Sequence, residues 1–342
     1  MHMADALLSP AVGIAMNVVS VAAIGVSVVK IKKEELSEKK IPIIGIAGAL
    51  VFAGQMINFT IPGTGSSGHI GGGILLAGLI GGVPAFLSLS AVLIIQCLFF
   101  ADGGLLALGC NIFNMGVIPC LLVYPLVFKP LIKGGTGYKR LTVASIVSVV
   151  IGLELGAFSV VLQTLLSGIA ELPFGVFTVL MLPIHLVIGL VEGIVTAAVL
   201  CFVYKMRPEI IESSQSGGRL SGVSTKKVVM ILAALTIVIG GAISLIASTN
   251  PDGLEWAVFK TTERTTGNQS DVEAEGGIYD AAVGIQSSTA IMPDYAFGSD
   301  PENAAGAPVA GIIGAAATFA VAGATGIIIS RVKKRRRSKA NA

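Results

Sequence analysis

The sequence predicts an all-α integral membrane protein. Of its 342 residues, 54% are apolar and only 13% are charged, and its mean hydropathy of +0.86 is far above the range of soluble globular domains. Its 43 glycines favour helices that pack closely through small residues, as membrane helices do. The four cysteines lie in apolar stretches without a paired spacing, so neither a disulfide framework nor a thiolate metal site is indicated.

Apolar runs long enough to cross the roughly 30 Å hydrocarbon core of a bilayer follow one another along the chain. They occupy residues 10–29, 42–60, 108–128, 141–168, 176–204, 228–248 and 308–330, with a broken run at 71–101. Loops rich in Lys and Arg stay in the cytoplasm. All but Lys260 and Arg264 of the 23 basic residues lie at 30–40, 129–140, 205–227 or 331–339. We therefore expect a multi-pass protein of the inner or plasma membrane, with its N-terminus outside and its C-terminus in the cytoplasm.

The broken run at 71–101 is expected to enter and leave the membrane on its outer face, because the loops on both sides of it must be outside. Gly81, Gly82 and Pro84 interrupt helical continuity in its middle, which predicts a helical hairpin that turns there. Its first arm is short for a full crossing. Counting both arms, the sequence predicts nine crossings.

The same pattern divides the chain into two modules. Residues 1–205 carry seven crossings and residues 226–342 carry two, and a polar cytoplasmic linker at 206–225 joins them. The second module contains an extracellular acidic segment at 250–306, which is rich in Gly, Ser and Thr and is expected to be only partly ordered. The basic tail is expected to anchor the chain near anionic membrane lipid, not to bind nucleic acid.

Met1 and His2 form a pair that can chelate a transition-metal ion. The α-amine of Met1, the amide nitrogen of His2 and its imidazole close two adjacent small chelate rings on one ion. The amine must be unblocked, and we expect it to be so because no cleavable signal peptide is predicted: no Lys or Arg precedes Lys30, and Asp5 lies within the segment. The alternative is that His2 is simply the second residue of a membrane chain.

His69 follows a glycine-rich loop at 61–68 and shares the outer face with the amino terminus. Such a loop can fold inward, so His69 can supply a fourth nitrogen to the Met1-His2 chelate; its alternative role is to bond backbone carbonyls. Four nitrogens, one of them a deprotonated amide, favour a square-planar ion, which indicates Ni(II) or Cu(II) before Zn(II).

Polar side chains near the outer ends of neighbouring helices are candidates to surround this site and to orient the imidazoles. They are Gln55, Asn58, Ser67, Gln96, Asp102 and Asn111. His185 and Glu192 lie two turns apart on one helix face within an apolar run, so they form a candidate intramembrane polar pair. For all of these residues the alternative is a hydrogen-bonded packing role.

Motifs for nucleotide binding and hydrolysis are missing from the sequence. It contains no GxxxxGK[ST], so the chain does not bind ATP through a P-loop. It also contains neither HExxH nor GxSxG, the motifs of common metalloproteases and serine hydrolases. We therefore expect a chain that is not an enzyme.

Several stretches resemble the substrate-specific M component of nickel/cobalt energy-coupling-factor transporters. They are MHMADALLSPAVG at 1–13, FAGQMINFTIPGTGSSGH at 52–69, LIIQCLFFADGGLLALGCNIFNMG at 93–116 and PIHLVIGLVEGIVTA at 183–197. Together they cover most of 1–205. STNPDGLEWA at 248–257 resembles the signature of the small N component, here fused in the same chain.

The resemblance implies a six-helix substrate-component fold with an extra N-terminal helix for 1–205, followed by a two-crossing N-like module. It implies that this helix brings Met1 and His2 to the loop histidine of the family, which is His69 here. It also implies a subunit of an ATP-driven nickel transporter that works with a transmembrane coupling subunit and cytoplasmic ATPase subunits. The alternatives are a cobalt-specific counterpart, a stand-alone channel or secondary carrier for a divalent ion, and a structural or sensory membrane protein.

Overall fold

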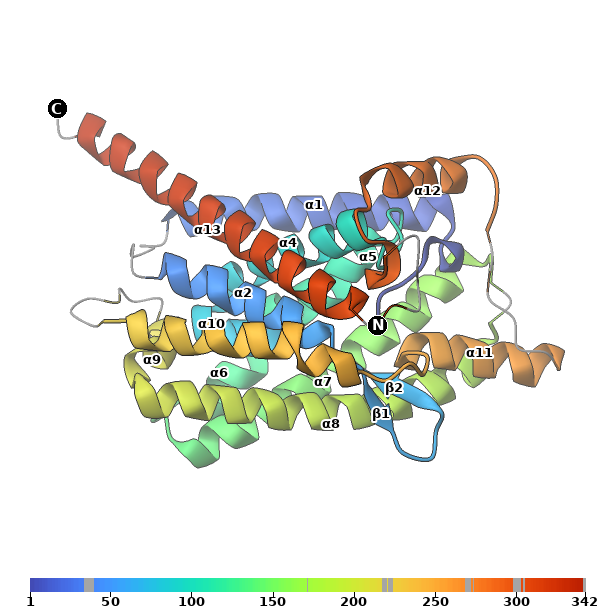
Figure 1. The fold of residues 1–342 in the computed structure, drawn as a ribbon, viewed down its shortest axis with the longest axis horizontal. Coiled ribbons are helices and arrows are strands. Elements are labelled where there is room, and N and C mark those ends of the chain that lie inside the picture. The colour runs from blue at the N-terminus through green and yellow to red at the C-terminus, as the bar shows by residue number, and fades with distance from the viewer. Residues whose placement is uncertain are drawn as a thin grey trace.

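The computed structural model describes residues 1–33, 40–170, 172–216, 220, 224–267, 272, 274–297, 303 and 305–340, without the side chains of 32–33 and 328–340. The described chain is nearly all helical, and its long helices lie side by side in one bundle (Figure 1). The N-terminus, a two-stranded sheet and the helices α11 (Gly253–Thr266) and α12 (Ile278–Thr289) gather at one end of the bundle (Figure 1).

The elements follow the expected order. Those of the first part are η1 (Asp5–Leu7), α1 (Pro10–Lys33), α2 (Ile41–Gln55), β1 (Phe59–Ile61), β2 (Ser66–Gly68), α3 (Gly73–Ile80), α4 (Gly82–Phe100), α5 (Leu108–Ile112), the π-helix η2 (Phe113–Phe128), α6 (Lys129–Ile132), α7 (Tyr138–Ser167) and α8 (Phe174–Met206). Beyond α8 they are α9 (Pro208–Ser216), α10 (Lys226–Gly241), η3 (Ile243–Ile246), α11, α12, η4 (Pro293–Tyr295) and α13 (Gly306–Ala340).

Seven of the described helices are long and apolar enough to cross a membrane. They are Pro10–Ile31, Gly82–Phe100, Leu108–Ile132, Tyr138–Ser167, Phe174–Met206, Lys226–Ile246 and Gly306–Ile327. Two expected crossings are shorter than predicted. Helix α2 has 15 residues and ends at Gln55, before the chain continues into β1, and α3 has 8 residues. The seven long helices indicate a multi-pass membrane protein.

The predicted break in the run at 71–101 is confirmed. Helix α3 ends at Ile80 and α4 begins at Gly82, and the two helices pack against each other. Gly81 between them has a φ of 91°, a left-handed value that favours glycine. The position of the turn therefore follows from the glycines and the proline that the sequence places there.

Helix α1 is held against the start of α5 by close backbone contact. Asn17 donates from Nδ2 to the carbonyl oxygen of Leu106 at 2.7 Å, and Ser20 Oγ donates to that of Gly109 at 2.6 Å. A Cβ on Gly109 would overlap the backbone of Met16 and Asn17. Only glycine permits this approach, which positions the N-terminal segment that precedes α1.

We expect Gly109→Ala to destabilise the protein. Its methyl group has to push α1 away from α5, and overpacking of this kind costs about 1–3 kcal/mol. The unfolding midpoint in detergent should fall clearly below that of the parent protein. Gly25→Ala on α1 is the matched control, because a Cβ there meets nothing within 4 Å; equal midpoints for the two variants would contradict the close contact.

The helices α10 and α13 pack against α2, so the second module is joined to the first. Gly311 of α13 meets Gly240 of α10, and a Cβ on Gly311 would lie 2.6 Å from the carbonyl oxygen of Gly240. Gly314 lies against the ring of Phe52, which is fully buried in α2. Small residues thus let these helices approach closely, as membrane helices commonly do.

The expectation of a flexible linker at 206–225 is wrong for residues 208–216, which form α9. Ile210 and Ile211 are buried, and the hydroxyl of Ser214 donates to the carbonyl oxygen of Gly78 at 2.6 Å. Burial of these isoleucines stabilises the helix against the bundle. The linker residues 217–219 and 221–223 lie outside the described part of the chain.

The acidic segment contains more regular structure than its composition suggests. Helices α11 and α12 and the turn η4 lie within 250–306. Residues 268–271, 273, 298–302 and 304 of this segment are outside the described ranges, as are the side chains of the basic tail.

Candidate metal centre

The N-terminal segment is buried inside the end of the bundle. Its Met3 amide donates to Asn111 Oδ1 at 2.8 Å, and Asn111 Nδ2 donates back to the carbonyl oxygen of Met3 at 3.2 Å. The amide of Gly104 donates to the same carbonyl at 2.9 Å. Asn111, predicted to surround the site, therefore acts on the backbone and fixes where Met1 and His2 lie.

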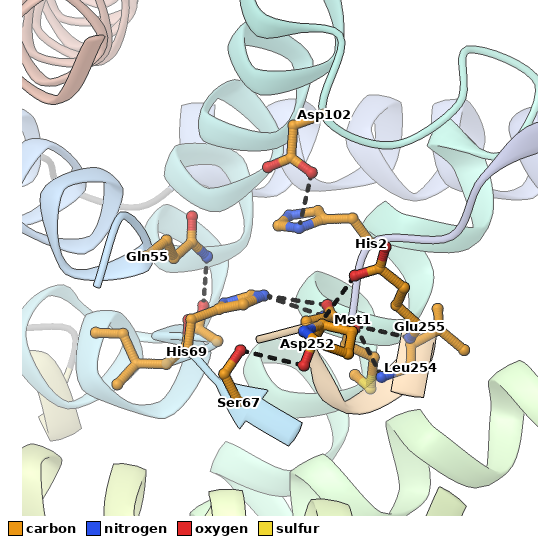
Figure 2. Close-up of polar contacts among 12 residues, drawn as sticks. Met1, His2, Gln55, Ser67, His69, Asp102, Asp252, Leu254 and Glu255 are labelled. Carbon is orange, nitrogen blue, oxygen red and sulfur yellow. Dashed lines mark hydrogen bonds and ion pairs between the residues drawn. The ribbon is translucent and has the colours of Figure 1, made fainter. Parts of the chain in front are cut away.

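Met1, His2 and His69 come together, although 68 positions separate Met1 from His69 (Figure 2). The Met1 amine lies 3.1 Å from His69 Nε2. The rings of His2 and His69 are stacked with their centroids 5.2 Å apart and an angle of 11° between their planes. The structure thus brings the three residues predicted as ligands into one cluster of nitrogen atoms.

His69 has the hydrogen bonding typical of a metal ligand. Its Nδ1 lies 3.1 Å from the carbonyl oxygen of Ile70. A carbonyl only accepts, so Nδ1 carries the proton and Nε2 keeps its lone pair. That lone pair accepts from the Met1 amine and is available to an ion.

His2 is buried and lies beside a carboxylate. Its Nδ1 is 3.3 Å from Asp102 Oδ1, and its Nε2 has no hydrogen-bond partner among the described residues. Burial lowers the pKa of His2 to about 4, although Asp102 opposes this shift. The ring is therefore neutral near pH 7, as a metal ligand must be. In a chelate that includes the backbone amide of His2, the ring has to turn Nδ1 away from Asp102 toward the ion.

Asp252 is the site residue that the sequence did not reveal. Its Oδ2 accepts from the Met1 amine at 2.7 Å and lies 3.8 Å from His69 Nε2 (Figure 2). Burial by itself raises the pKa of Asp252, but the amine and His69 hold it well below its usual range. Its Oδ1 accepts from the amides of Leu254 and Glu255, which makes Asp252 the N-cap of α11. The Asp-x-x-Glu pattern signals a helix start, but not where that helix lies.

The other polar residues that were predicted to surround the site hold its loops in place or line its cavity. Gln55 Nε2 donates to the carbonyl oxygen of Gly71 at 3.0 Å, and Gln96 Nε2 donates to Gln55 Oε1 at 2.9 Å. Ser67 Oγ donates to the carbonyl oxygen of Asn250 at 2.8 Å. The side chain of Asn58 lines the cavity of the site. Of the residues predicted to orient the imidazoles, Asp102 alone contacts one in the described structure.

The structure does not bring His185 and Glu192 together as a pair. Glu192 accepts from the amides of Gly71 and Gly72 at 2.8 and 2.9 Å, so it holds the loop that follows His69. His185 Nδ1 lies 2.7 Å from the carbonyl oxygen of Met181, one turn earlier in α8. His185 lines a small cavity with Met1, His69 and Asp252, and its Nε2 has no hydrogen-bond partner in the described part.

A cavity of about 460 Å³ is lined by His2, His69, Asp102, Asp252 and Tyr295, among others. In the described part of the chain, no three His, Cys, Asp or Glu side chains are grouped so that they could hold a metal ion. The cluster offers an ion the Met1 amine and the imidazoles of His2 and His69, and the backbone amide of His2 is the next nitrogen along the chain. This donor set suits Ni(II) or Cu(II).

Comparison with known proteins agrees with these features. Residues 2–210 match the family described as the cobalt uptake substrate-specific transmembrane region, and residues 226–331 match the PDGLE domain. The chain is 30% identical over 326 residues to a putative fused nickel transport protein of Archaeoglobus fulgidus, covering 94% of this chain and 96% of that protein. It is 34% identical over 219 residues to a probable fused nickel transport protein of Lactiplantibacillus plantarum, covering 61% and 66% of the two chains.

The fold is also similar to that of a solved structure. A crystal structure of a transition metal transporter superposes with a TM-score of 0.54 at 27% identity, covering 64% of this chain and 100% of that chain. The predicted fold class and the resemblance are thereby confirmed. The chain belongs to the family of nickel and cobalt transport components, in which a substrate-specific M component is here fused to an N-like component.

Proposed function

We propose that this chain captures Ni(II) at the outer face of the cell membrane and delivers it to an ATP-driven transporter of the energy-coupling-factor type. The observation that carries the proposal is the meeting of the Met1 amine, His2 and His69 in one buried cluster. The fused nickel transport proteins among its relatives support the choice of metal.

The proposed ligands are the Met1 amine, the His2 amide nitrogen, His2 Nδ1 and His69 Nε2. On binding, the amine and the amide each release a proton, since only the deprotonated nitrogens coordinate. Four nitrogen ligands, one of which is an anionic amide, favour square-planar coordination, which suits Ni(II). Co(II) is the alternative cargo, because the family includes cobalt uptake components.

The chain is proposed to divide its work between its modules. Residues 1–205 bind the metal, 206–225 form the cytoplasmic connection, and 226–342 form the N-like module. A transmembrane coupling subunit and cytoplasmic ATPase subunits supply the energy, in agreement with the lack of a P-loop motif in this sequence. The distribution of basic residues supports an N-terminus outside and a C-terminus inside.

Two measurements test this function. The purified protein should bind one Ni(II), with the visible absorption of a square-planar ion; absence of Ni(II) binding would contradict the proposal. Vesicles that contain this chain should take up Ni(II) only with the coupling and ATPase subunits and ATP. Uptake by the chain alone would instead identify a channel or secondary carrier.

A further inference from the structure

A carboxylate of the N-like module lies inside the metal site of the M component. Asp252 belongs to the segment between α10 and α11, yet its Oδ2 is 2.7 Å from the Met1 amine. The two residues are 251 positions apart in the sequence. The carboxylate also lies 3.8 Å from His69 Nε2, so it is close to two of the proposed ligands at once.

The position of Asp252 is fixed from both sides. Its Oδ1 caps α11, while the amide of Ser67 donates to the carbonyl oxygen of Pro251 at 2.8 Å. Trp256, one turn into α11, donates from Nε1 to the carbonyl oxygen of Thr64 at 2.9 Å. The hairpin that leads to His69 therefore holds the start of α11, and the cap leaves Oδ2 directed at the amine.

The N-like module also reaches the other proposed ligand residue. The hydroxyl of Tyr295 donates to Asp102 Oδ2, and the other carboxylate oxygen of Asp102 lies 3.3 Å from His2 Nδ1. One segment of the N-like module thus contacts the amine directly and His2 through Asp102.

The charges of the empty and loaded sites explain why a carboxylate is needed there. In the empty site the protonated amine carries one positive charge, which Asp252 neutralises. In the loaded site, a divalent ion bound by one amidate and three neutral nitrogens also carries one net positive charge. Both protons that leave, one from the amine and one from the amide, pass to water. The charge of Asp252 therefore balances the amine in one state and the complex in the other, while Asp102 accepts a hydrogen bond from the hydroxyl of Tyr295.

We propose that Asp252 is a positioning residue that stays outside the coordination sphere. It neutralises the charge of the Ni(II)-amidate complex and accepts a hydrogen bond from the coordinated Met1 amine. This inference rests on the proposed function, and it gives the N-like module a direct part in metal capture.

The test compares Ni(II) affinity and visible absorption across substitutions of Asp252 in the full chain. Asp252→Asn keeps the size and the helix cap but removes the charge. We expect its affinity to fall at least tenfold while the absorption bands stay in place, because the four nitrogens remain. Asp252→Glu restores the charge and should regain affinity relative to Asp252→Asn. Glu263→Gln removes one charge from the far end of α11 and should bind like the parent protein.

The outcomes separate this inference from the function on which it rests. Parent-like affinity of Asp252→Asn, with the parent protein binding Ni(II), would overturn the role of Asp252 alone. Shifted absorption bands in Asp252→Asn would make Asp252 a ligand and would also overturn it. An equal loss in Asp252→Asn and Asp252→Glu would show that shape and not charge matters, against the proposal. A parent protein that does not bind Ni(II) would overturn the proposed function and this inference together.

Discussion

Acetylation of the Met1 amine is expected to lower Ni(II) affinity at least about 100-fold, or roughly 2.7 kcal/mol. The acetyl group converts the amine of Met1 into an amide and brings no new amine, so the chelate loses its terminal nitrogen. The site also has little room for the acetyl group, since Met1 is 7% exposed and its nitrogen lies between Asp252 Oδ2 at 2.7 Å and His69 Nε2 at 3.1 Å. Titration calorimetry of the purified protein measures the loss.

The experiment needs two samples of the same chain, both beginning at Met1, one with a free amine and one with this amine acetylated. Mass spectrometry of each N-terminus confirms its state. Equal Ni(II) affinities would remove the amine from the ligand set and leave the two imidazoles to hold the ion. Equal unfolding midpoints without metal would show that the acetyl group acts on the site and not on the fold.

The order of the helices could be predicted because the apolar runs and the basic loops between them can be read directly from the sequence. The lengths of two elements could not be predicted. Hydropathy stays high from Ile41 to Ile61, yet α2 ends at Gln55 and residues 59–61 pair with 66–68 as a β-hairpin. Hydropathy does not distinguish a helix from a short strand, and the pairing depends on contacts made across the loop.

Tertiary burial also explains why residues 208–216 form a helix and not a flexible linker. Pro208 and the SSQSGG run at 213–218 suggest a flexible segment, but Ile210 and Ile211 are almost fully buried against the bundle. Two apolar side chains in a polar stretch are too few to predict a buried helix. The contact of Ser214 with Gly78 depends on residues 136 positions apart, which the local sequence does not reveal.

The cluster of Met1, His2 and His69 could be predicted because coordination chemistry restricts the choice of candidate ligands strongly. The chain has only three histidines, and the charge pattern places His2 and His69 on one face. Asp252 could not be found in this way, because it is one of many acidic residues in 250–306 and nothing in the sequence separates it from the others. Its role depends on the packing of α11. Likewise, Glu192 bonds to Gly71 and Gly72 and not to His185.

His69→Ala is expected to weaken Ni(II) binding at least about tenfold, or roughly 1.4 kcal/mol. The substitution removes the nitrogen that comes from outside the Met1-His2 chelate, and it leaves a gap beside the ring of His2, whose centroid lies 5.2 Å from that of His69. The remaining three nitrogens can still hold an ion with water as the fourth ligand, so the loss should be smaller than for a blocked amine. The absorption bands should shift as a nitrogen is replaced by oxygen.

Added imidazole provides the decisive control for His69→Ala. Free imidazole can enter the gap and return a nitrogen to the ion, so it should restore part of the affinity and move the absorption bands back toward those of the parent protein. Thr60→Ala, in the same hairpin, removes the exposed hydrogen bond from Thr60 Oγ1 to Ser248 Oγ and should bind Ni(II) like the parent protein. Parent-like affinity of His69→Ala would exclude His69 from the ligands. A loss that imidazole does not reverse, with unshifted bands, would mean that His69 supports the fold of the site without touching the ion.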